Sequence, residues 1–64
     1  MSTGAYIKEK REEQGLTQAE LANKIGYDRS LIAHIERGTK IVTLPQAVAI
    51  AEALGTTVDA LASA

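Results

Sequence analysis

The chain has 64 residues, of which 45% are apolar, and its formal net charge at pH 7 is −1. A chain of this length forms one small domain whose core lies near the lower limit for independent folding. The lack of cysteine excludes disulfides and thiolate metal sites and fits a cytoplasmic environment. The longest apolar run, at residues 47–51, is far too short to span a membrane, and the N-terminus has no signal-peptide pattern.

The charged residues are unevenly distributed along the chain. All seven basic residues precede residue 41, and the only charged residues after it are Glu52 and Asp59. This asymmetry permits a local basic face in the first part of the chain. A net charge of −1 does not favour a general polyanion-binding surface.

Glycines and capping residues divide the chain into five predicted helices. Four glycines each follow a run with helical periodicity, where a helix commonly ends in a left-handed residue: Gly15, Gly26, Gly38 and Gly55. TQAE at 17–20 and TLPQ at 43–46 are capping boxes, and Asp28 and Thr57 are suitable N-caps. These signals predict helices over residues 3–14, 18–25, 29–37, 44–54 and 58–63. Because no strand, linker or repeat is indicated, we expect an all-α fold, a compact five-helix bundle over residues 1–64.

Apolar residues at helical spacing predict the buried face of each helix. On the fourth predicted helix this face comprises Leu44, Ala47, Val48, Ala51 and Leu54. This assignment leaves Ala49 and Ile50 outside the face that the helix needs. The other helices supply further predicted core residues: Ile7, Leu16, Leu21, Ala22, Ile25, Ile32, Ile35, Val58 and Leu61.

The second and third predicted helices are joined by a turn of three residues, GYD at 26–28. Ala22 is small enough to let a neighbouring helix pass closely, and Gly26 supplies the turn. Ile32 and Ile35 then pack against the second helix. This spacing is what two short helices need to cross steeply over a tight turn, so it predicts a helix-turn-helix at residues 18–37.

From Arg11 to Leu61 the chain resembles the helix-turn-helix domain of the XRE family, which includes the lambdoid phage repressors and Cro. The resemblance is carried by LTQAELA at 16–22, the turn glycine at 26, IAHIERG at 32–38 and ALG at 53–55. These motifs are specific and extend over nearly the whole chain. The resemblance implies that the helix at 29–37 lies in the major groove of double-stranded DNA.

The outward side of that helix carries candidate base-reading residues. Arginine can bind guanine through two hydrogen bonds, serine suits several bases, and histidine can donate to guanine or to a phosphate. An alanine methyl can contact the methyl group of thymine. The predicted base-reading residues are Arg29, Ser30, Ala33 and His34. The alternative is that Arg29 and His34 are simply solvated.

Further residues are expected to position this helix on DNA. In the resembled family a glutamine that begins the second helix contacts a phosphate, and this role is carried over to Gln18. The same resemblance implies a salt bridge between Arg11 and Glu36 that ties the reading helix to the bundle. Other predicted phosphate contacts lie at the end of the helix and in the loop after it: Arg37, Thr39 and Lys40.

A single short reading helix does not easily secure specificity, so we expect a homodimer on a palindromic operator. The family often has a proline in the loop after the reading helix, whereas this chain has TKIVT at 39–43. Spare apolar residues could form a self-complementary surface: Ile41, Val42, Ile50, Val58 and Leu61. The alternative is that Ile41 and Val42 fold back onto the fourth helix and the chain is a monomer.

The sequence therefore predicts a transcription regulator, in this family most often a repressor. One histidine and no cysteine leave no residues for a catalytic or metal centre, and we expect no cofactor, small-molecule ligand or membrane partner. The alternative is a protein-interaction module that uses the same fold, for example to bind a toxin. The negative net charge and the spare apolar residues favour this alternative, whereas the residues suited to DNA at 29–34 oppose it.

Overall fold

The computed structural model describes residues 1–64 and contains helices but no strands. The helices are α1 (Thr3–Glu13), α2 (Gln18–Ile25), α3 (Arg29–Arg37), α4 (Leu44–Leu54) and α5 (Val58–Ser63). The predicted all-α fold is confirmed, and each helix begins and ends within one residue of its predicted bounds. None of the five helices combines the length and apolarity that crossing a bilayer requires.

Local hydrogen bonds explain where these helices begin. Both predicted capping boxes are present, at Thr17 with Glu20 and at Thr43 with Gln46. The backbone N–H of Thr17 donates to the Glu20 carboxylate at 2.8 Å, which holds the pKa of Glu20 below its ordinary value. Asp28 occupies the N-cap position of α3, but its side chain makes no capping hydrogen bond. The predicted N-cap position of Asp28 is therefore confirmed, but α3 begins there without a side-chain cap.

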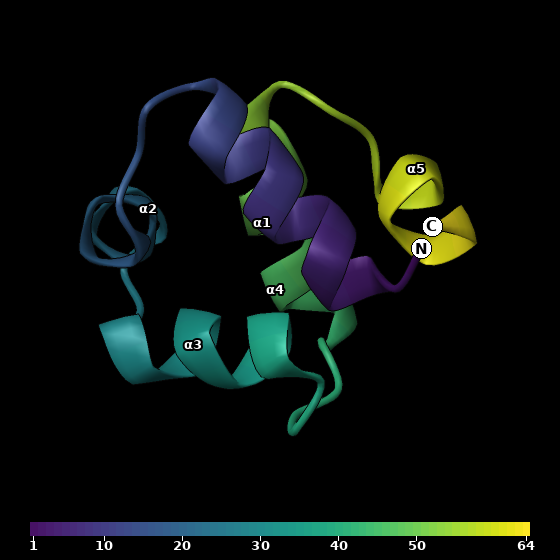
Figure 1. The fold of residues 1–64 in the computed structure, drawn as a ribbon, viewed down its shortest axis with the longest axis horizontal. Coiled ribbons are helices and arrows are strands. Elements are labelled where there is room, and N and C mark those ends of the chain that lie inside the picture. The colour runs from purple at the N-terminus through teal and green to yellow at the C-terminus, as the bar shows by residue number, and fades with distance from the viewer.

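The helices are arranged so that α3 lies along one edge of the molecule (Figure 1). In this view α2 is seen nearly end-on beside α3, while α1 and α4 fill the middle and α5 lies beside both chain termini. α3 packs against α1 and α2, and α4 packs against α1, α2 and α5. The side of α3 that faces away from α1 and α2 has no neighbouring helix.

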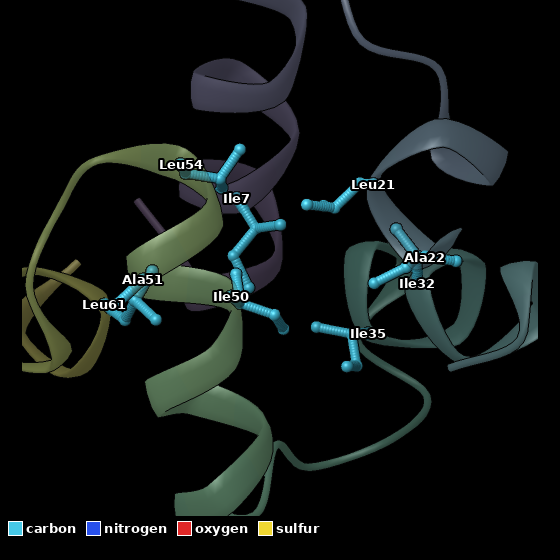
Figure 2. Packing of buried hydrophobic residues seen from close by; sticks show 9 residues of the cluster. All are labelled: Ile7, Leu21, Ala22, Ile32, Ile35, Ile50, Ala51, Leu54 and Leu61. Atoms are coloured by element: carbon cyan, nitrogen blue, oxygen red, sulfur yellow. The ribbon is translucent and has the colours of Figure 1, made fainter. Parts of the chain in front are cut away.

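Every helix contributes to one hydrophobic core, shown in Figure 2. Its nine members are Ile7, Leu21, Ala22, Ile32, Ile35, Ile50, Ala51, Leu54 and Leu61. Four residues predicted for the core are only partly buried and pack against its margin: Leu16, Ile25, Ala47 and Val58. The two isoleucines of α3 point inward, so the core fixes which side of α3 faces outward.

The buried face of α4 differs from the predicted one. Leu44 is 68% exposed and Val48 is 41% exposed, whereas Ile50 is fully buried and points from α4 into the centre of the cluster (Figure 2). The sequence of α4 is apolar on most of its circumference, so periodicity alone fits two overlapping stripes. The need to contact α1, α2 and α5 together selects the stripe that contains Ile50. The prediction that Ile50 and Leu61 form a dimer surface is wrong, because both side chains lie in the core.

α1 is held against α3 by a backbone contact at Gly4, a buried residue that the sequence analysis did not single out. A Cβ atom at Gly4 would overlap the carbonyl oxygen of Ile35 and would lie 2.9 Å from the carbonyl oxygen of Glu36. Real Cβ atoms do not approach backbone atoms so closely. Only glycine therefore lets the first turn of α1 rest on the last turn of α3.

Candidate nucleic-acid interface

A buried ion pair lies beneath the C-terminal half of α3. The Nε atom of Arg11 donates to Oε2 of Glu36 at 2.7 Å, and Nη2 donates to Oε1 at 3.0 Å. The two side chains are 9% and 4% exposed. Nη1 of Arg11 donates to the carbonyl oxygen of Leu16 at 2.8 Å. The hydrogen bond to Glu36 raises the pKa of Arg11 above its ordinary value, so the guanidinium stays charged.

The same carboxylate also binds Gln18, at the start of α2. Nε2 of Gln18 donates to Oε1 of Glu36 at 3.0 Å. Glu36 thus connects α1, α2 and α3, and it holds the amide group of Gln18 against α3. Thr17 Oγ1 accepts from the backbone N–H of Glu20, which leaves the N–H groups of Gln18 and Ala19 without an acceptor. These two backbone donors are free polar groups at the positive end of α2, where Glu36 already occupies one N–H of the Gln18 amide.

The predicted base-reading residues do not all lie on the surface. Arg29, Ser30 and His34 are exposed; Ser30 and His34 lie on the side of α3 turned away from Ile32 and Ile35, and Arg29 lies at the exposed N-terminal end of the helix. Ala33 is only 8% exposed. Its methyl group is largely covered, so the predicted contact with a thymine methyl is not available to it. Three polar side chains remain at the N-terminal end and middle of the helix.

The structure joins three of the predicted DNA-contacting residues into one hydrogen-bonded group. Arg37 Nη2 lies 3.2 Å from Nδ1 of His34, and Thr39 Oγ1 lies 3.0 Å from the same atom. Thr39 Oγ1 also donates to the backbone carbonyl oxygen of His34 at 3.1 Å. No contact among these three residues is predicted from the sequence. The spacing of His34 and Arg37, one helical turn apart, is the signal that could have connected them.

The exposed surface around α3 is basic although the whole chain is not. It carries Arg29, Arg37 and Lys40, whereas the exposed carboxylates near it, Glu20 and Asp28, are confined to the N-terminal end of α3 beside Arg29. The charge of Glu36 is neutralised below the surface by Arg11. The local balance therefore favours an anionic partner on this side of the molecule.

The model of the helix-turn-helix family matches residues 7–61. The chain belongs to the XRE family of helix-turn-helix proteins. The resemblance inferred from the sequence motifs is therefore confirmed, and the match spans all of α2, α3 and α4 and most of α1.

Two relatives of this XRE-family chain are similar in sequence. The immunity repressor protein of Bacillus phage phi105 is 43% identical over 61 residues, which are 95% of this chain and 42% of the repressor. An HTH-type transcriptional regulator of Methanothermobacter thermautotrophicus is 47% identical over 49 residues, which are 77% of this chain and 71% of that protein. The XRE-family chain thus spans less than half the length of the phage repressor.

Solved structures resemble this XRE-family chain closely. The DNA-binding domain of the P22 c2 repressor superimposes with a TM-score of 0.92 over 97% of this chain and 82% of that one. At 24% identity this likeness establishes the fold alone. The biofilm master regulator SinR, solved in complex with DNA, is 30% identical with a TM-score of 0.89, over 94% of this chain and 97% of that one.

Proposed function

We propose that this XRE-family chain is a sequence-specific, DNA-binding transcription repressor that places α3 in the major groove. The observation that carries the proposal is the exposed set Arg29, Ser30 and His34 on a helix whose other side is fixed in the core. The repressor name of the phage phi105 relative and the DNA-bound structure of SinR support it.

Each of the three side chains suits the edges of bases. Arg29, in the first turn of α3, is placed to bind O6 and N7 of a guanine with its two terminal nitrogens. Ser30 is adjacent and can donate or accept, so it can serve more than one base. His34 lies one turn farther along the exposed side and reaches a neighbouring base pair.

Phosphate contacts would position the helix over these bases. The free backbone N–H groups of Gln18 and Ala19 point from the positive end of α2, which is a favourable site for a phosphate oxygen. In this proposal the side chain of Gln18 keeps its hydrogen bond to Glu36, and the backbone carries the phosphate contact. Lys40 and the remaining N–H groups of Arg37 would contact the phosphates at the other end of α3.

The Arg29→Ala substitution tests base recognition. It is expected to weaken binding to the preferred sequence by about 1–3 kcal/mol and to relax preference at one base pair. Lys40→Ala is the matched comparison, because it should weaken all duplexes alike and reduce the slope of log affinity against log salt by about one unit. The measurement is binding to preferred and random duplexes over a range of salt. Equal losses on both duplexes for Arg29→Ala would assign this residue to a phosphate instead.

The proposal as a whole is tested by selecting bound sequences from a random DNA pool. We expect one enriched, two-fold symmetric site with half-sites about 10 bp apart, on one face of the duplex. Affinity for it should fall steeply with salt, because phosphate binding releases counterions. A pool without any enriched sequence would contradict the repressor proposal and favour the protein-interaction module, whose apolar contacts depend little on salt.

We further propose that two copies of the chain pair on such a site through an exposed apolar patch, defined here as Ile41, Leu44 and Val48. Their exposed fractions are 90%, 68% and 41%. The patch follows directly after α3 in the chain, where the connecting loop enters α4 (Figure 1). It replaces the predicted surface that included Ile50 and Leu61, and retains Ile41 from it.

The substitution Leu44→Glu tests this pairing surface. It is expected to lower affinity for a site with two half-sites by about 10- to 100-fold, since burying a leucine side chain contributes about 1.5–3 kcal/mol. Affinity for a single half-site should change much less. Ala62→Glu adds the same charge at an exposed position of α5 and serves as the control. If both variants bind the double site equally, the patch does not join two copies.

A further inference from the structure

We propose that Arg37 fixes the tautomer of His34 and thereby sets the base that His34 recognises. The inference rests on the proposed DNA-binding function and assigns Arg37 as a positioning residue for base recognition. With Nδ1 occupied, the outward nitrogen Nε2 carries the ring proton. His34 is then a pure hydrogen-bond donor toward DNA, and it requires an acceptor on the base edge beneath it.

The contact with Arg37 decides the tautomer. A guanidinium group has only donors and stays protonated in proteins, so Nδ1 of His34, at 3.2 Å from Arg37 Nη2, must present its lone pair. A proton on Nδ1 would set two donors against each other. The neutral ring then carries its proton on Nε2.

Thr39 is compatible with this arrangement. Its Oγ1 lies 3.0 Å from Nδ1 and 3.1 Å from the carbonyl oxygen of His34, so in this tautomer its one proton is shared between these two acceptors. The hydroxyl alone would permit the other tautomer, in which Nδ1–H donates to Oγ1 while the hydroxyl donates to the carbonyl oxygen. Arg37 therefore selects between two arrangements that Thr39 permits equally.

The fixed tautomer has a direct consequence for base choice. In the major groove guanine offers two acceptors, O6 and N7, whereas cytosine offers only its N4 amino donor. A ring that presents Nε2–H therefore favours guanine and disfavours cytosine on the strand that it contacts. No carboxylate forms an ion pair with His34. The only charged group in contact with the ring is the positive Arg37.

The first measurement determines the tautomer of His34 in the protein without DNA. Imidazole ¹⁵N spectra of the whole chain, recorded at about pH 8 where histidine is mostly neutral, report which nitrogen carries the proton. The wild-type ring is expected to carry it on Nε2 alone. In Arg37→Met a measurable share of Nδ1–H should appear, because Thr39 Oγ1 can then accept from Nδ1. Identical ring spectra in the two proteins would overturn the inference.

The second measurement determines the base preference at the position that His34 contacts. His34→Ala first identifies the base pair that His34 contacts, as the position where preference is lost. Arg37→Met is then expected to reduce the ratio of affinities for guanine and cytosine at that position by about fivefold or more. A change of this size is usual when one base pair of a binding site is mismatched. Lys40→Met, which removes a nearby charge without a bond to His34, should leave this ratio unchanged while weakening all duplexes.

The outcomes separate this inference from the function on which it rests. If the wild-type protein selects a DNA motif but Arg37→Met behaves like Lys40→Met, then Arg37 binds only phosphate. The tautomer inference is then overturned and the repressor proposal stands. If the wild-type protein selects no motif, the repressor proposal fails and the base preference assigned to His34 fails with it. A fall in the ratio together with the new Nδ1–H signal supports the inference.

Discussion

Replacing Arg11 by methionine is expected to lower the free energy of unfolding by about 3–5 kcal/mol. Methionine retains most of the length and apolar packing of the arginine stem but leaves the Glu36 carboxylate, 4% exposed, without its counter-charge. The single hydrogen bond from Gln18, at 3.0 Å, does not replace a bidentate guanidinium. Urea denaturation followed by circular dichroism measures the effect.

The double variant Arg11→Met/Glu36→Leu separates the cost of an unpaired charge from the net value of the pair. Replacing both members of a buried ion pair by apolar residues is often nearly neutral, so most of the lost stability should return. Lys10→Met is the matched control, because its 3.4 Å bond to Glu13 lies on the surface and contributes about 0–1 kcal/mol. If Arg11→Met were no worse than Lys10→Met, the ion pair would not hold α3 in place.

The ends of the helices were predictable because their causes are local. A capping box such as that at Thr17 and Glu20 acts over three residues, and Gly26 with a φ of 76° ends α2 by its own backbone conformation. The crossing of α2 and α3 follows from the turn and from Ala22, Ile32 and the apolar spacing around them. Sequence patterns over a few residues are therefore sufficient to predict the helix ends and this crossing.

The buried face of α4 could not be predicted in the same way. Two stripes of apolar residues overlap on this helix, and the choice depends on where α1, α2 and α5 lie. The stripe with Leu44 and Val48 fits the periodicity, but it is the exposed one, so the prediction of Ile50 as a surface residue is also wrong. The exposed residues Arg29, Ser30 and His34 were located correctly, because the position of Ile32 and Ile35 fixes the opposite side of α3.

The Arg11–Glu36 pair and the contact at Gly4 show two kinds of long-range feature. The pair joins residues 25 positions apart, and only the family resemblance pointed to it. No comparable signal marked Gly4, since a glycine in the first turn of a helix is commonly just a weak helix former. What requires glycine there is the backbone of Ile35 and Glu36, which folding brings against it.

The substitution Gly4→Val is expected to lower the free energy of unfolding by about 3 kcal/mol, the upper end of the usual cost of overpacking. The overlap is with backbone atoms, which have no alternative rotamer. α1 must therefore move away from α3 or unwind its first turn, and either change strains the 2.8 Å hydrogen bond from Thr3 Oγ1 to the carbonyl oxygen of Leu61. Thermal and urea denaturation measure the loss.

The sign of this effect distinguishes packing from helix propensity. Valine is a better helix former than glycine by a few tenths of a kcal/mol, so propensity alone predicts a small gain in stability for Gly4→Val. The matched control is Ala5→Val, at the exposed neighbouring position of α1, where propensity predicts a loss of at most about 0.7 kcal/mol. A large loss at Gly4 with a small one at Ala5 follows only if α1 rests directly on the backbone of α3. Equal, small effects at both positions would show that the two helices do not touch there.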